Sequence, residues 1–200
     1  MWELERINRL MKLNMKKYIL LLGFLVVWVL NTEGQTSEAF NRVPMLNGKV
    51  VFEQFVVSDQ SSSSDQNYAK LQKWARDRYT GNPLLTGIRF DDKSQTVTVS
   101  SKSHLKLPAN SAGNSTEMIM NYRFDVSASG AGSMLVMRDI TFQSVDKDAT
   151  SFFPKVYTAE QMISDQAIGV GGEEGELRNT TRKAALQFVN ELYTDFSSVF

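Results

Sequence analysis

The chain contains no cysteine among its 200 residues. This absence excludes disulfides, thiol catalysis, zinc–cysteine sites and iron–sulfur clusters. It also excludes a bacterial lipoprotein anchor, which requires a cysteine directly after the apolar leader. The folded part of the chain must therefore be held together by its core alone.

The chain also lacks an excess of charge of either sign. Its 22 basic and 22 acidic side chains balance, and residues 1–34 hold five of the basic and three of the acidic ones. Residues 35–200 therefore carry 17 basic and 19 acidic groups, a formal net charge of −2. Nucleic-acid-binding domains normally gather Lys and Arg on one face, and membrane-surface sites carry polybasic clusters. The composition argues against both kinds of partner.

One long apolar run is present, the 13 residues Tyr18–Leu30, and it follows Lys16 and Lys17. A membrane-spanning helix needs about 20 apolar residues, whereas the core of a signal peptide needs about 7–15. We therefore predict a signal peptide over residues 15–34, which would export the chain to the periplasm or cell envelope. An uncleaved membrane anchor and a buried core helix are the alternatives.

The predicted cleavage site lies after Gly34, because Thr32 and Gly34 place small residues before Gln35. Residues 1–14 are interpreted as an upstream start artefact. Residues 35–42 are polar and predicted to be flexible. Residues 43–200 are predicted to form a single domain, and the 166 residues after the cleavage site suffice for a substantial core.

Helical spacing of apolar residues predicts two main helices. The first spans Asp65–Tyr79, is capped by Ser64 or Asp65, and turns Tyr68, Leu71, Ala75 and Arg78 to one side with Trp74 beside them. The second spans Glu176–Phe196, with an apolar stripe formed by Leu177, Thr181, Ala184, Ala185, Phe188, Leu192 and Phe196. A short helix is expected at Ala159–Asp165.

Alternation of apolar and polar residues predicts five strands. They span Lys49–Val57, Gly87–Phe90, Gln95–Leu107, Glu117–Ser127 and Ser133–Val145. The fourth alternates most clearly, with Ile119 as the one apolar residue on its polar side. The fifth is mixed, because Leu135 and Met137 oppose Met134 and Val136. The order β-α-β-β-β-β-α predicts an α+β fold, an antiparallel sheet with helices on one face. The other sheet face is expected to be open to water or to a partner.

Several of these segments together resemble a known family. They are Val43-Pro44, the entry strand from Asn47 to Phe52, the helix that contains Trp74, and the strand from Arg138 to Phe142. With the signal peptide before Gln35, they are similar to the DUF4468 family, exported proteins of Bacteroidetes with a TBP-like fold and no known function. The resemblance implies a curved antiparallel sheet of about five strands with helices on one side. It implies no activity, and TBP-like names a shape rather than DNA binding.

The residues that could take part in catalysis or ligand binding are better explained by structural roles in this chain. His104 is the only histidine, so it is interpreted as a surface side chain. Asp91-Asp92 suits a hairpin turn. Asp146-Lys147-Asp148 lacks the glycine and distant glutamate of an EF-hand and is interpreted as a solvated loop. Gly169–Gly175 lacks the Gly-Lys-Ser/Thr ending of a phosphate loop and suits a helix entry. We therefore predict no catalytic, cofactor-binding or metal-binding residue.

Two functions remain open. The first is a non-enzymatic interaction module of the cell envelope, binding a protein through the open sheet face or a sheet edge. The second is a carrier of a small apolar ligand, with a pocket between the sheet and the last helix. Met118, Met120 and Met137 could line such a pocket, although packing in the core explains them better.

Overall fold

The computed structural model describes residues 40–59, 61–81, 86–109, 113, 115–145, 155–169 and 171–200. The predicted signal peptide, residues 1–14 and the segment Asp146–Pro154 lie outside this part of the chain. All described residues belong to one unit, Glu38–Phe200. Within them, no helix combines the length and the apolar character needed to cross a membrane.

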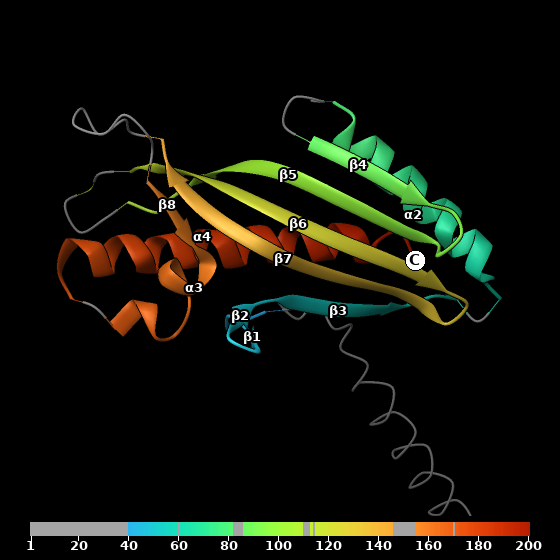
Figure 1. Ribbon diagram of the computed structural model, residues 1–200, viewed down its shortest axis with the longest axis horizontal. Coiled ribbons are helices and arrows are strands. Elements are labelled where there is room, and N and C mark those ends of the chain that lie inside the picture. Colours follow the sequence, from blue (N-terminus) through green and yellow to red (C-terminus); the bar gives the residue numbers. More distant parts are fainter. Residues whose placement is uncertain are drawn as a thin grey trace, which may run out of the picture. The chain divides into compact units, whose positions relative to one another are not determined.

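A six-stranded antiparallel sheet forms one layer of this unit (Figure 1). The strand order is β3-β7-β6-β5-β4, and β8 also pairs with β7. The strands are β3 Phe52–Val57, β4 Thr86–Asp91, β5 Thr96–Lys106, β6 Glu117–Ser129, β7 Gly132–Ser144 and β8 Val156–Thr158. Each of the five predicted strands overlaps a strand of this sheet, and the α+β fold is confirmed. The strand β8 was not predicted, because three residues are too few to show alternation.

A separate hairpin of β1 (Met45–Leu46) and β2 (Lys49–Val50) precedes the main sheet. Asn47 and Gly48 connect its strands with φ of 50° and 75°. Positive φ at both central residues suits a type I′ turn, so the predicted Asn-Gly turn is confirmed. The predicted single strand Lys49–Val57 is wrong, because Val51 donates its N–H to Pro44 O at 3.3 Å and separates β2 from β3.

The first long helix, α2 (Ser64–Tyr79), begins with a capping box. Ser63 Oγ accepts from Gln66 N at 3.2 Å, and Gln66 Oε1 accepts from Ser63 N at 2.8 Å. This reciprocal pair satisfies two backbone donors, which makes Ser63 the cap instead of Ser64 or Asp65. The buried face of α2 differs from the predicted one at the last turn of the helix. Tyr79 is buried there, whereas Arg78 lies at the rim of the helix, so the prediction for Arg78 is wrong.

The last helix, α4, spans Gly172–Ser197 and starts four residues before the predicted Glu176. Gly171 occupies the N-cap, and Glu173 and Glu174 lie in the first turn, where the helix dipole favours negative charge. The Gly/Glu-rich segment is thus a helix entry, as predicted. The short elements before it are α3 (Ala159–Met162) and η1 (Ala167–Gly169).

Both long helices cover the same face of the sheet, and Trp74 of α2 lies where they meet. Its ring centroid is 5.8 Å from that of Phe124 on β6 and 5.3 Å from that of Phe196 on α4. Its Nε1 donates to Asp195 Oδ2 at 2.8 Å. The inward side chains of β6 close this core, and Met118, Met120, Tyr122, Phe124 and Val126 are all buried.

Tyr193 of α4 anchors the strand β3 from inside the core. Its hydroxyl lies 2.7 Å from Phe52 O and 3.2 Å from Leu135 O, on β3 and β7. Burial raises the pKa of Tyr193, so the hydroxyl stays protonated and can donate. Phe40 packs against the same ring at 5.0 Å and exchanges two hydrogen bonds with Asn190. Phe40 thus belongs to the folded unit although it falls in the segment predicted to be flexible, and residues 35–39 lie outside the described part.

The tight β6–β7 hairpin depends on Gly132. Its φ is +150°, and a Cβ atom at this position would lie 2.0 Å from Val56 O and 2.9 Å from the Phe55 ring. Gly130, two residues earlier, has nothing within 4 Å of the same position. Only Gly132 is therefore required by the close approach of β3 to this hairpin.

We expect Tyr193→Phe to lower the free energy of unfolding by about 1–2 kcal/mol, because two buried carbonyls lose a donor while the ring packing is kept. Chemical denaturation at neutral pH measures the change. Tyr79→Phe is the matched control, since the Tyr79 side chain is also buried but its hydroxyl has no hydrogen-bond partner among the described residues, so its removal should change stability little. Equal effects of the two variants would contradict the role of Tyr193.

Gly132→Ala is expected to destabilise the fold by on the order of 3 kcal/mol, because the methyl group must displace the backbone of β3. Gly130→Ala, in the same hairpin, should lie within about 0.5 kcal/mol of the parent chain. Thermal unfolding of the two variants measures the difference in stability. A Gly132→Ala variant as stable as Gly130→Ala would show that β3 does not approach the hairpin as closely as described.

Candidate interaction surface on the open sheet face

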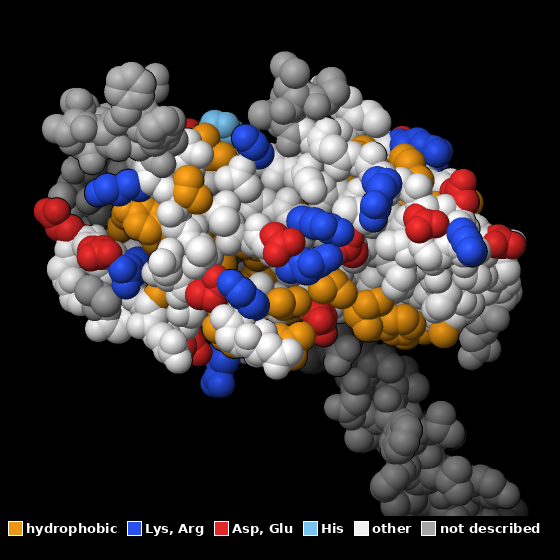
Figure 2. Space-filling model, viewed as in Figure 1, with side chains coloured by type: hydrophobic (Ala, Val, Ile, Leu, Met, Phe, Trp, Pro, Cys, Tyr) orange, Lys and Arg blue, Asp and Glu red, His pale blue; other side chains and the backbone are white. Residues whose placement is uncertain are grey.

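The sheet face opposite the helices is uncovered over the described strands. Figure 2 shows this face, with charged side chains gathered over the middle of β6 and β7 and apolar ones along β3. The outward residues of β6 are half-buried or exposed, while its inward residues are buried. The alternation predicted for Glu117–Ser127 is therefore confirmed. As a result, the side chains of Arg123 and Asp125 lie on the open face.

A β-bulge changes which side chains of β7 reach this face. The register shifts between the pairs Asn121↔Thr141 and Arg123↔Arg138, so β7 holds one extra residue. Asp139 lies in the bulge with φ of 55°. The extra residue lets Met137 and Ile140 both point into the core, and it leaves Arg138 on the open face beside Arg123.

Asp125 is the centre of a polar cluster formed with Thr98, Arg123 and Arg138. Its Oδ1 accepts from Thr98 Oγ1 at 2.7 Å and from an Arg123 nitrogen at 3.1 Å. Its Oδ2 accepts two bonds from Arg138, at 3.1 Å from Nε and 2.8 Å from a terminal nitrogen. One carboxylate thus orients two guanidinium groups, and the two-bond contact with Arg138 fixes the plane of that group.

The cluster alters the acidity of its central carboxyl. Partial burial favours the neutral form and would raise the pKa of Asp125, but the hydrogen bonds from Thr98, Arg138 and Arg123 outweigh it and lower this pKa. The same contacts raise the pKa of Arg138. Asp125 and Arg138 are therefore both charged at neutral pH, and the cluster presents paired charges instead of a bare cation.

An apolar patch adjoins the polar cluster, consisting of Phe55, Val57, Met134 and Val136. Phe55 is 44% exposed and Val57 is 72% exposed, which is unusual for side chains of this size. Phe55 lies opposite Met134 in the β3–β7 ladder, and Val136 lies opposite Asp125 in the β6–β7 ladder. The mixed alternation of the fifth predicted strand therefore has a structural reason, since β7 places apolar side chains on both faces.

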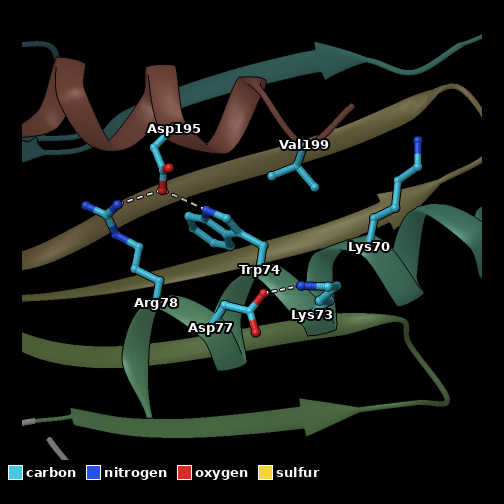
Figure 3. A pocket seen from close by; sticks show the side chains of 7 residues that line it. All are labelled: Lys70, Lys73, Trp74, Asp77, Arg78, Asp195 and Val199. Carbon is cyan, nitrogen blue, oxygen red and sulfur yellow. Dashed lines mark hydrogen bonds and ion pairs between the residues drawn. The ribbon is translucent and has the colours of Figure 1, made fainter. Parts of the chain in front are cut away.

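A hollow of about 520 Å³ lies on the other layer, between α2 and the end of α4 (Figure 3). Four of its five charged side chains form two ion pairs, and the fifth, Lys70, lies 5.9 Å from the centre of the Phe200 ring. Arg78 donates to Asp195 Oδ2 at 2.6 Å, and Lys73 pairs with Asp77. Because Trp74 Nε1 also donates to Asp195, an anionic ligand would have to compete with these existing pairs. The hollow is therefore a weaker candidate site than the open face.

The structure places the other candidate residues in structural roles. Asp91 caps its own turn by accepting from Lys93 N and Ser94 N, and Asp92 accepts from Tyr68 of α2 at 2.9 Å. His104 lies on the surface, 3.8 Å from Glu117. Asp146-Lys147-Asp148 lies outside the described residues. No group of three or more His, Cys, Asp or Glu suited to a metal occurs among the residues that the structure describes.

The three methionines considered as a possible pocket lining pack directly against neighbouring side chains. Met120 and Met137 have no exposed surface, and Met118 has 1%. A cavity large enough for a ligand would leave accessible surface on the side chains that lined it. These methionines therefore form part of the packed core.

The roles of Asp125 and Asp195, each of which accepts hydrogen bonds from two or more side chains, were not predicted. A signal for Asp125 was present, because a carboxylate on the polar side of a clearly alternating strand must face away from the core. The position of Arg138 on the open face could not be predicted in the same way. It depends on the bulge at Asp139, which shifts the register of β7 and cannot be recognised from residue types alone.

The lowered pKa of Asp125 predicts a pH-dependent contribution to stability. The contribution is complete above the unfolded pKa of about 3.9 and is lost as the pH falls through the lower folded pKa. Asp125→Asn should therefore destabilise the chain by about 1–2 kcal/mol at pH 7, and the difference should shrink below pH 4. Unfolding curves from pH 7 to pH 2.5 test this, with Asp59→Asn, at an exposed loop position, as control. A difference that stayed constant across this range would contradict the ionic role.

No protein-family model matches the chain, and no curated protein is similar enough in sequence to count as a match. Two solved structures match it in fold. A TBP-like protein from Parabacteroides distasonis ATCC 8503 is 22% identical, with a TM-score of 0.66, over 78% of this chain and 96% of that one. A DUF4468 family protein from Bacteroides ovatus ATCC 8483 is 19% identical, with a TM-score of 0.61, over 78% of this chain and 89% of that one. The chain therefore has the TBP-like fold that its resemblance to the DUF4468 family implied.

Proposed function

We propose that the chain is an exported, non-enzymatic interaction module that binds a protein of the cell envelope through its open sheet face. The observation that carries the proposal is the contact between the polar cluster around Asp125 and the apolar patch. The predicted signal peptide over residues 15–34 supports the location.

The chemistry of the face suits a protein partner. Interface cores are enriched in Arg, Met and aromatic residues, and the residues that dominate binding are often Arg, Trp or Tyr. Arg123 and Arg138 are held in place by Asp125 before any partner arrives, so binding would cost little side-chain entropy. Met134 and Val136 provide apolar surface directly beside them.

The same face is unsuited to a phosphate backbone. Asp125 pairs with both arginines, and Asp139 lies 3.7 Å from Arg138, so the two cations are matched by two carboxylates. Nucleic-acid sites depend on cations that remain available to phosphates. The proposal therefore names a protein whose own surface combines polar and apolar groups.

We expect Arg123→Glu to reduce capture of the partner by about tenfold or more, because a third carboxylate would break the cluster and repel acceptors on the partner. Capture is measured by photo-cross-linking from Ser100, an exposed position that lies opposite Arg123 on the open face. The reaction is carried out in the envelope fraction of the organism that makes the chain.

Two controls separate specific binding from adhesion. The same photoreactive residue at Ala69, exposed on α2 in the other layer, should not capture the partner. Lys93→Glu, an equal change of charge in an exposed turn, should leave capture from Ser100 unchanged. Capture of the same protein from both positions, or equal capture by the Arg123→Glu variant with an unchanged melting temperature, would refute the proposed surface.

A further inference from the structure

The outer edge of β3 has backbone groups without partners among the described residues. Ser58 N donates to Ala131 O at 3.1 Å, in the same register as the β3–β7 ladder. Because hydrogen-bonding direction alternates along a strand, Phe52, Gln54 and Val56 bond to β7. The N–H and C=O groups of Glu53, Phe55 and Val57 therefore point away from the sheet.

The two edges of the sheet carry different side chains. At the β4 edge, the exposed positions are Gly87, Arg89 and Asp91. At the β3 edge, they are Glu53, Phe55 and Val57. Charged side chains protect an edge from pairing with another chain, whereas an apolar edge strand favours it. The β4 edge is therefore protected and the β3 edge is open to strand addition.

The sequence of β3 is complementary to itself. In an antiparallel pairing of two copies centred on Phe55, each Glu53 lies opposite Val57 and the two Phe55 residues face each other. No like charges meet, and an aromatic pair forms at the centre, which is favourable across strands. The same pairing of β4 about Arg89 would place two arginines in direct opposition.

We propose that two copies of this chain associate through antiparallel pairing of their β3 strands about a two-fold axis at Phe55. This pairing satisfies the outer N–H and C=O groups of Glu53, Phe55 and Val57 and joins the two sheets into one. The two-fold axis stands perpendicular to the sheet, so both open faces lie on the same side. The two apolar patches then form one continuous strip between the two Asp125 clusters.

This inference goes beyond the proposed function, because it concerns the strand edge and a second copy of the chain. The full chain is expressed and purified in the form in which the cell leaves it, and its mass is measured by sedimentation between about 1 and 100 µM. We expect a dimer with a dissociation constant in the micromolar range, as for small interfaces. Phe55→Lys, which places two positive charges at the axis, should weaken association by about thirtyfold or more.

Val145→Lys is the matched control, because Val145 is also exposed and lies outside β3. It should leave the dimer intact. Folding of each variant is checked by its far-ultraviolet circular dichroism and melting curve. A chain that is monomeric at 100 µM would overturn the inference, and so would a Phe55→Lys variant that dimerises as the parent does.

The absence of cysteine permits a second, direct test of the register. Directly opposed residues of an antiparallel pair have Cβ atoms about 5.5 Å apart, within reach of a short bismaleimide. Phe55→Cys should therefore cross-link to a covalent dimer in high yield, whereas Arg89→Cys, at the centre of the other edge strand, should not. Equal yields at the two positions would overturn the pairing. A monomeric chain that still captured a partner from Ser100 would refute the dimer and leave the proposed function standing.

Discussion

The indole of Trp74 joins the parts of the core on which the rest of the fold depends. Its ring contacts Phe124 of the sheet and Phe196 of α4, and its N–H reaches Asp195. A buried indole N–H without an acceptor would be costly, so Asp195 fixes how α4 lies beside α2. Because both helices meet at this residue, they cover the same sheet face, and the described residues leave the other face uncovered.

The side chains on an uncovered sheet face are subject to two physical requirements. Its side chains lie on strands whose opposite sides are fully buried, yet they face water and need polar partners. The cluster around Asp125 meets most of this need, because the carboxylate accepts from Thr98, Arg123 and Arg138, although Nε of Arg123 has no hydrogen-bond partner among the described residues. The apolar patch beside it does not, since Phe55 and Val57 expose large side chains without cover. Their juxtaposition distinguishes this face from an ordinary solvated surface.

The position of β3 follows from contacts on both of its sides. Tyr193 holds its first residue from within the core, and Gly132 lets it approach the β6–β7 hairpin closely. These contacts fix β3 as the last strand at its end of the sheet. Its register then determines which side chains and which backbone groups remain outside, so the apolar edge is a consequence of the packing in the interior.

The sequence by itself determined the element types, the two long helices, the approximate positions of five strands of the sheet, and the alternation that places Arg123 and Asp125 on the outer face. These features depend on local periodicity, which residue types encode directly. Only the tertiary structure decided that Arg138 joins Asp125, that Tyr79 replaces Arg78 in the core, and which apolar side of β7 is exposed. Each depends on a bulge or on packing between distant segments. A strand with apolar residues on both sides gives no local sign of which side the helices will cover.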